Sequence, residues 1–323
     1  MPAQFSGALR ETQDLRPIAP NCAARCSFLR QGQAADRAHG PGGKVSGRPQ
    51  LLIESLAFAE SPRWHAGELW FSEFFLQQVL RVDAQGELHE VAKVPQQPSG
   101  LGWLPDGRLL VVSMLNHKLL RLDGDVLVEV ADLAAFAGGP CNDMVVDARG
   151  GAYVGNFGFD LFAQPQQRQP AALVYVPPGG APRVVAQGLE FPNGAAITPD
   201  GATLIIGETF GKRLTAFDIA ADGSLHGRRV WAELGPAAPD GICLDAEGAV
   251  WVASPRSNEF LRVREGGAVL QRVPCDRQAI ACVLGGADGR RLFMVSGRVR
   301  PAPASLADRV GADHLGRCRR AGR

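Results

Sequence analysis

One pattern of hydrophobic and polar positions recurs between residues 51 and 297. An apolar strand leads into a tight turn containing Asp or Gly, and a second apolar strand follows that ends in small or polar residues. The six turn glycines are spaced by 40, 43, 51, 47 and 41 residues: Gly67, Gly107, Gly150, Gly201, Gly248 and Gly289. Turns of this type between β-branched and aromatic runs are typical of β-hairpins.

The segments between the hairpins complete each copy with two more strands, for example 77–94 and 117–133. Four strands in a period of about 40 to 50 residues are typical of a propeller blade. An α/β domain would need helical periods of about 10 to 15 residues between the strands, and the chain shows none. A β-sandwich does not explain the six copies. The pattern therefore predicts an all-β fold, a six-bladed β-propeller.

The two ends of the chain lack this pattern. Residues 1–49 have no period of 2 or 3.6 and include a run rich in Gly and Pro at 39–49, so we predict a disordered or mis-started extension. Residues 298–323 are predicted to form an irregular, Arg-rich tail. The propeller is accordingly placed at 50–297.

The composition of the chain limits the classes of molecule that it is expected to bind. The 34 basic and 33 acidic residues nearly cancel, which gives no reason to expect nucleic acid or an anionic membrane as a partner. No stretch approaches the roughly 18 apolar residues of a membrane span. Cys141, Cys243 and Cys282 lie in apolar runs and are expected to be buried free thiols, which fits a cytoplasmic location. We expect a small-molecule substrate and a monomer or weak homo-oligomer.

Polar residues interrupt the repeat at one position. Eight residues before the turn glycine stand Ser99, Asn142, Asn193, Asp240 and Ala281, and in the shorter first copy Glu60 stands seven before Gly67. Inner strands surround the axis of a propeller, so these positions converge.

Four of the converging residues, Glu60, Asn142, Asn193 and Asp240, offer hard oxygen ligands. They predict one divalent cation in the axial channel: Ca²⁺ foremost, with Zn²⁺, Mn²⁺ and Mg²⁺ as alternatives. Asn142 is also a candidate substrate contact. Asn-Gly and Asp-Gly pairs are common in turns, which is the competing interpretation of Asn193 and Asp240. The shared register of four such residues favours the metal site.

Further candidates lie close to these positions. Asp143 either orients a water molecule or belongs to a turn. Asn156 and Glu208, at the ends of second strands, either contact substrate or terminate the strand. Phe157 and Phe210 either form aromatic walls of a pocket or pack in the core. No histidine pair, GxSxG motif or nucleotide-binding motif is present, which disfavours a His-based zinc site, an α/β-hydrolase and a nucleotide cofactor.

Four runs carry a resemblance to a known family. ESPRW (60–64), CNDMVVDARGGAYVGN (141–156), EFPNGAAITPDGATLIIGET (190–209) and APDGICLDAEGAVWVAS (238–254) resemble the SMP-30/gluconolactonase/luciferin-regenerating-enzyme family. The resemblance covers about residues 51–296. It implies a six-bladed propeller, a catalytic divalent cation held by the four residues named above, and hydrolysis of sugar lactones.

The chain departs from the family at two places. Members that act on gluconolactone carry an arginine two positions before the metal-binding Asn, where this chain has Pro140, so the substrate stays open. The family also continues past the last hairpin with a strand that helps to close the ring. The sequence after Gly297 does not match such a strand, and we expect weaker closure.

The ligands and the resemblance together imply a mechanism. A bound cation polarises the substrate carbonyl and lowers the pKa of water. Asp240 is the first candidate to accept the proton and Asp143 is the second. A metallo-esterase or phosphotriesterase is an alternative, which a smaller and more apolar pocket around Phe157 and Phe210 would favour. A non-enzymatic binding propeller is the third hypothesis.

Overall fold

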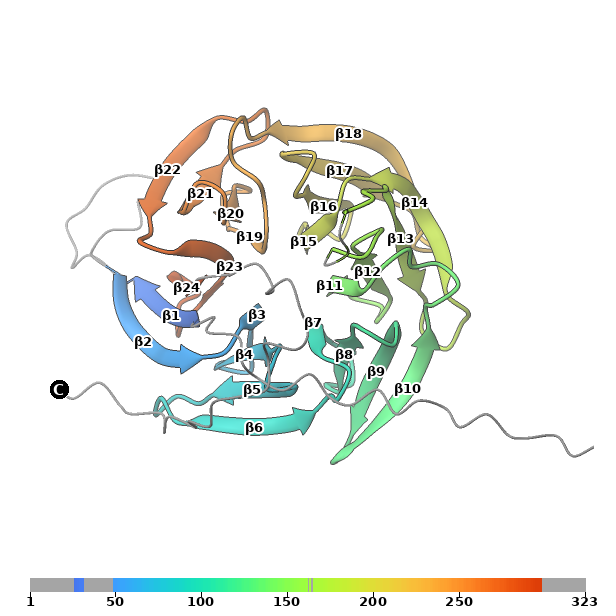
Figure 1. Cartoon of the computed structure of the whole chain (residues 1–323), viewed down its shortest axis with the longest axis horizontal. Coiled ribbons are helices and arrows are strands. Elements are labelled where there is room, and N and C mark those ends of the chain that lie inside the picture. Colours follow the sequence, from blue (N-terminus) through green and yellow to red (C-terminus); the bar gives the residue numbers. More distant parts are fainter. Residues whose placement is uncertain (1–25, 32–48, 162, 164, 298–323) are drawn as a thin grey trace, which may run out of the picture.

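The computed structural model describes residues 26–31, 49–161, 163 and 165–297. These residues form an all-β propeller, in which four-stranded antiparallel sheets surround a central axis (Figure 1). Five blades each consist of four consecutive strands. In chain order, their strands are β3 (Ala59–His65), β4 (Glu68–Glu73), β5 (Gln78–Val82) and β6 (Leu88–Lys93) in blade 1; β7 (Pro98–Trp103), β8 (Leu109–Ser113), β9 (Lys118–Asp123) and β10 (Val126–Asp132) in blade 2; β11 (Cys141–Val146), β12 (Ala152–Asn156), β13 (Ala171–Val176) and β14 (Arg183–Leu189) in blade 3; β15 (Pro192–Ile197), β16 (Thr203–Glu208), β17 (Arg213–Ile219) and β18 (Leu225–Glu233) in blade 4; and β19 (Ile242–Leu244), β20 (Val250–Ser254), β21 (Glu259–Val263) and β22 (Val269–Pro274) in blade 5.

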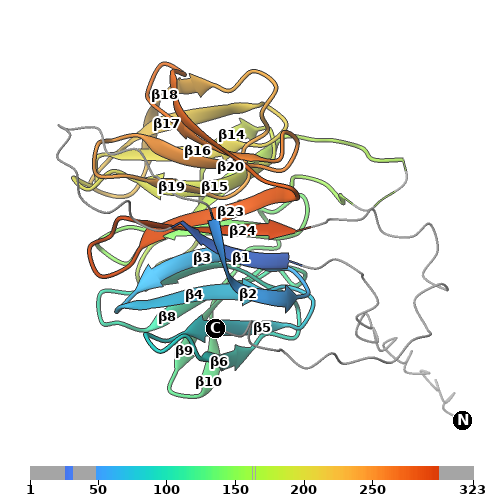
Figure 2. The ribbon, with the colours of Figure 1, turned by 90° about the vertical axis from the view of Figure 1, so that its left-hand side faces the viewer.

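A further sheet combines the two ends of the described chain, and we call it the closing sheet. Its order is β2-β1-β24-β23, with β1 (Cys26–Gln31), β2 (Pro49–Leu56), β23 (Gln278–Gly285) and β24 (Arg291–Gly297). Strand β1 pairs antiparallel with β24 from Cys26↔Gly297 to Gln31↔Leu292. Figure 2 shows β1 beside β24 on this side of the ring.

The closing sheet corrects two expectations. Residues 26–31 lie in the segment 1–49 that we predicted to be disordered, yet they form a paired strand. We also expected weaker closure, because no closing strand was predicted after Gly297; the structure instead supplies closing strands from before the first blade. The rest of 1–49 and the tail 298–323 lie outside the described residues. The reason for the miss is physical: residues 32–48 separate β1 from β2, and its other partner β24 lies at the far end of the fold, so no tight turn signals either pairing.

Burial follows from the stacking of blades. Strands β8, β12 and β20 are buried at every position, because each is a second strand covered on both faces by neighbouring blades. The core between blades 4 and 5, for example, joins Ile205 and Trp231 to Val252 and Leu261. All six turn glycines adopt positive φ, from 69° to 88°, which confirms the hairpin turns predicted from the sequence.

The inner strands place one set of residues at one end of the molecule. Contacts join β3, β7, β11, β15, β19 and β23 in a closed ring. Each inner strand starts at the same end of the propeller and runs toward its hairpin turn at the other end, so residues at the strand starts share the first end. Within the described ranges, no helix is long and apolar enough to cross a membrane.

Candidate functional site

The four predicted metal ligands stand at the starts of inner strands. Glu60 lies in β3, Asn142 in β11 and Asn193 in β15, while Asp240 lies two residues before the start of β19. In β11 and β15 the pairing with the second strand shifts register across the ligand, and in β3 it shifts directly after Glu60. Such bulges redirect a side chain away from the regular alternation of a strand. The local irregularity therefore sets where these side chains point.

Carboxylates gather at this end of the axis. Burial raises the pKa of Glu60 well above its ordinary value, and the negative charges of Asp240 and Asp143 raise it further. Burial also raises the pKa of Asp240 to about 8, although a hydrogen bond from the Asn193 side chain opposes the shift. Repulsion between neighbouring buried carboxylates is relieved when a cation lies between them.

The side-chain amides of Asn142 and Asn193 are fixed by hydrogen bonds that their nitrogen atoms donate. Asn142 Nδ2 donates to the backbone oxygen of Pro192 at 3.2 Å. Asn193 Nδ2 donates to Thr209 Oγ1 at 3.2 Å, and Thr209 Oγ1 donates in turn to Pro239 O at 2.8 Å. These bonds link each amide to the residue that precedes the next ligand around the axis.

The donor set fits a hard divalent cation. Two half-buried carboxylates and two amide oxygens match the oxygen ligands of Ca²⁺, with Mg²⁺ and Mn²⁺ as related ions. In the part of the chain that the structure describes, no three or more His, Cys, Asp or Glu side chains gather as a metal site by themselves. A cation at the axis would accordingly need the oxygens of Asn142 and Asn193 as well as those of Glu60 and Asp240.

Asp143 is fixed by three donors on one oxygen. Ser61 Oγ donates to its Oδ1 at 3.1 Å, Arg63 Nη2 at 2.6 Å and Met144 N at 2.8 Å. Arg63 also donates to Leu101 O at 3.1 Å, so it joins blades 1, 2 and 3. Because these three donors fix the position of its carboxylate, Asp143 is suited to orient other groups at the site. The roles of Ser61 and Arg63 were missed, although both stand in the run ESPRW.

Glycines let the inner strands approach one another here. A Cβ on Gly194 would lie 2.4 Å from Ile242 N and 2.7 Å from Asp240 O, and one on Gly241 would lie 2.4 Å from the Cβ of Ala281. Gly194 lies within β15 and Gly241 directly precedes β19, and neither has a positive φ. The turn interpretation of Asn193-Gly194 and Asp240-Gly241 is therefore wrong; these glycines serve close packing.

Asn156 and Glu208 are tied to the protein itself. Asn156 is 1% exposed, donates to Ala172 O at 2.7 Å and accepts from Gly158 N at 2.9 Å. Glu208 is 0% exposed and accepts from Glu190 N at 2.7 Å, from Arg213 at 3.0 and 3.1 Å, and from Thr215 Oγ1. We assign both a structural role in place of the predicted substrate contact.

Aromatic side chains gather at the same end of the propeller. Phe157, Phe159 and Phe191 pack together with Met114, and half-buried Phe74 and Phe210 lie against them. The rings of Phe157 and Phe191 stack at 4.6 Å, and those of Phe191 and Phe210 meet edge to face at 4.9 Å. We call this set the aromatic cluster; it includes the two predicted wall residues and draws on blades 1 to 4. Phe157 N donates to Pro140 O at 3.0 Å, which places the cluster beside the strand that carries Asn142.

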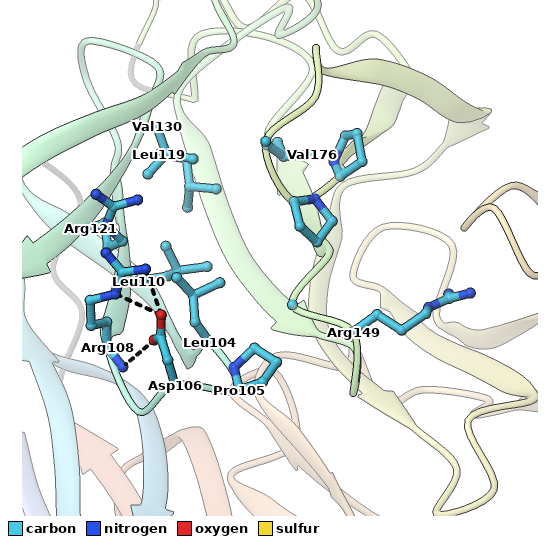
Figure 3. Close-up of a pocket in the computed structure, with 14 residues that line it drawn as sticks. Leu104, Pro105, Asp106, Arg108, Leu110, Leu119, Arg121, Val130, Arg149 and Val176 are labelled. Carbon is cyan, nitrogen blue, oxygen red and sulfur yellow. Dashed lines mark hydrogen bonds and ion pairs between the residues drawn. The ribbon is translucent and has the colours of Figure 1, made fainter.

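A groove of about 290 Å³ lies at the opposite end of the propeller, between blades 2 and 3 (Figure 3). Its arginines are engaged already: Arg108 pairs with Asp106 at 2.5 Å, Arg121 with Asp123 at 2.5 Å, and Arg149 with Asp147 at 2.9 Å. The groove adjoins the hairpin turns rather than the strand starts, so it is separate from the candidate site.

Comparisons with known proteins match all five blades and the strands β23 and β24 of the closing sheet. The family described as SMP-30/Gluconolactonase/LRE-like region matches residues 58–298. The chain belongs to this family. Within the SMP-30/gluconolactonase family, the 6-deoxy-6-sulfogluconolactonase of Pseudomonas putida is 25% identical over 265 residues, 80% of this chain and 89% of that protein.

Solved structures of the SMP-30/gluconolactonase family share the fold. A gluconolactonase from Xanthomonas campestris has a TM-score of 0.65 at 25% identity, over 76% of this chain and 88% of that one. A calcium-binding regucalcin from Agrobacterium tumefaciens has a TM-score of 0.62 at 21% identity, over 73% and 81%. The resemblance derived from the four sequence runs is confirmed.

Proposed function

We propose that this protein is a metal-dependent hydrolase that opens the ring of a sugar lactone. The observation that carries the proposal is the convergence of Glu60 and Asp240 at the starts of inner strands, where burial raises the pKa of both and the charge of Asp240 raises that of Glu60 further. Family membership supports the reaction, since relatives are named as lactonases that act on sugar-derived lactones.

One divalent cation, held by Glu60, Asn142, Asn193 and Asp240, would supply Lewis-acid polarisation of the lactone carbonyl and activation of water. Ca²⁺ is the first choice, because a structural relative is named as calcium-binding. Asp240 would accept the proton of the attacking water, a role suited to a carboxylate beside the cation. Asp143, held by Ser61 and Arg63, orients the water and adds negative charge beside Glu60.

Metal removal and site variants test this proposal. We expect EDTA to abolish hydrolysis of gluconolactone and Ca²⁺ or Mn²⁺ to restore it, measured by pH-stat titration of the released acid. Asp240→Ala and Glu60→Ala each remove a ligand, so both should lower turnover by at least about 100-fold and weaken cation binding. Arg108→Ala, in the groove at the far end, is the control. A fully active, cation-replete Asp240→Ala protein would refute the mechanism.

A second candidate is a metallo-esterase for substrates with an apolar group. The aromatic cluster and Pro140 favour it, because neither offers hydrogen bonds to sugar hydroxyls. Phenyl acetate and paraoxon, assayed beside a panel of sugar lactones, separate the two candidates by kcat/KM. Phe210→Ala should lower kcat/KM for phenyl acetate by about 10-fold and leave that for gluconolactone unchanged if the second candidate is correct.

A further inference from the structure

In three blades, the last side chain of the second strand accepts a hydrogen bond from a backbone N–H that lies two or three residues before a proposed metal ligand. Glu73 Oε1 accepts from Phe58 N at 2.7 Å, two residues before Glu60. Glu208 Oε2 accepts from Glu190 N at 2.7 Å, three residues before Asn193. Ser254 Oγ accepts from Ala238 N at 3.1 Å, two residues before Asp240. The three side chains that accept these hydrogen bonds are 0% exposed: Glu73, Glu208 and Ser254.

Blade 3 makes the corresponding link with backbone atoms. Phe157 N donates to Pro140 O at 3.0 Å, two residues before Asn142. The side chain at the end of its second strand, Asn156, binds Gly158 N and Ala172 O instead. The same backbone bond occurs in blade 2, where Met114 N donates to Gln97 O at 2.9 Å although no proposed ligand follows. The buried side-chain acceptors of blades 1, 4 and 5 are therefore the feature that accompanies proposed ligands.

The carboxylate of Glu73 lacks the ion pair that stabilises Glu208, so its burial destabilises the fold. In blade 4, Glu208 pairs in register with Arg213, which forms an ion pair with it at 3.0 Å. In blade 1 the corresponding partner of Glu73 is Gln78, which carries no charge. Among the described residues, Oε2 of Glu73 is buried without a hydrogen-bond partner. Burial of an unpaired carboxylate destabilises a fold, and such features are found where geometry serves function.

We propose that Glu73, Glu208 and Ser254 are positioning residues, which hold the lead-in backbone so that Glu60, Asn193 and Asp240 reach a common cation. The inference rests on the metal centre of the proposed function and adds residues to it. Groups that fix metal ligands typically contribute about 10- to 100-fold to metal affinity. The side chains act through the backbone and touch neither substrate nor cation.

Blade 2 offers a matched control. Ser113 occupies the same position at the end of β8 and is 1% exposed, but the first strand of its blade has Ser99 at the ligand position. Ser254→Ala and Ser113→Ala thus remove the same hydroxyl from equally buried sites in two blades. Only the first of these sites leads to a proposed ligand.

Calorimetric titration of the full chain with Ca²⁺ or Mn²⁺ alone tests the proposal. We expect Ser254→Ala to weaken cation binding by about 10-fold, Ser113→Ala to leave it within about 2-fold, and Ser254→Thr, which keeps the hydroxyl, to restore it. Equal cation affinities of Ser254→Ala and Ser113→Ala would overturn the positioning role. A wild-type chain that binds no divalent cation would instead overturn the proposed function.

Glu73 gives a second, independent comparison. Glu73→Gln keeps an oxygen that accepts from Phe58 N, whereas Glu73→Leu removes it. We expect the Gln variant to bind Mn²⁺ like the wild type and the Leu variant to bind it about 10-fold more weakly. If the Leu variant fails to fold, Ser254→Ala decides the question. Loss of affinity in the Gln variant to the same extent as in the Leu variant would show that charge, and not the hydrogen bond, matters.

Discussion

At the scale of single residues, the molecule places carboxylates where water does not reach them. Glu73 and Glu208 stand at the same position of two blades and are both 0% exposed, yet their surroundings differ. Burial raises the pKa of Glu73 from 4.5 to about 7, because its backbone hydrogen bonds do not compensate for lost hydration. Burial acts on Glu208 as well, but hydrogen bonds from Arg213 and Thr215 outweigh it and lower the pKa.

The raised pKa of Glu73 predicts a pH-dependent stability. The folded state holds its proton more tightly than the unfolded state, so stability falls as pH rises from about 4.5 through 7. Glu73→Gln removes this penalty. We expect its free energy of unfolding, relative to wild type, to rise by about 2 kcal/mol between pH 5 and pH 8 in urea titrations.

Glu208→Gln is the control for that comparison. Its carboxylate is stabilised by Arg213, so the substitution leaves a cation without its partner and should destabilise the fold at pH 8. A Glu73→Gln protein whose stability relative to wild type is the same at both pH values would contradict the assignment.

At the scale of elements, the inner strands combine bulges with glycines. The bulges in β3, β11 and β15 redirect the ligands, and Gly194 and Gly241 allow neighbouring strands to approach closely. The ligand set was predictable from sequence because hairpin turns are local signals and give a register. The bulges and the hydrogen bond from Phe58 N to Glu73 were not predictable, since both depend on the pairing of two strands in three dimensions.

Gly194→Ala tests the close packing of β15 and β19. The added methyl carbon would lie 2.4 Å from Ile242 N, a backbone atom that cannot turn aside. We expect a loss of about 2 kcal/mol in unfolding free energy and a cation affinity lower by at least about 10-fold. Gly201→Ala, at a hairpin turn with open space around it but positive φ, is the comparison: it should lose stability alone.

At the scale of the whole molecule, the ring is joined by the closing sheet. The period of the sequence predicted the blades, but it placed the start of the fold at residue 50 and missed β1. The pairing of Cys26 with Gly297 joins residues that are far apart along the chain, and no local pattern signals such a contact. Burial of Ser27 beneath Arg277, which donates to its hydroxyl at 2.9 Å, supports the docking of β1.

Truncation tests the role of β1. A chain that starts at residue 49 lacks β1 and leaves the edges of β2 and β24 unpaired, whereas a chain that starts at residue 26 keeps all described strands. We expect the shorter chain to melt about 5 °C or more below the longer one and to aggregate more readily in light-scattering measurements. Equal melting temperatures would show that β1 is dispensable.

The closing sheet also fixes the order in which the protein can be completed during synthesis. Strands β1 and β2 leave the ribosome first, but β24, the partner of β1, leaves it after all five blades. The nascent chain must therefore carry an unpaired edge through nearly the whole of translation. A circularly permuted gene in which β1 and β2 follow β24 would shorten the interval between the synthesis of β1 and that of its partner. Each sheet would then be completed in the order in which it is made.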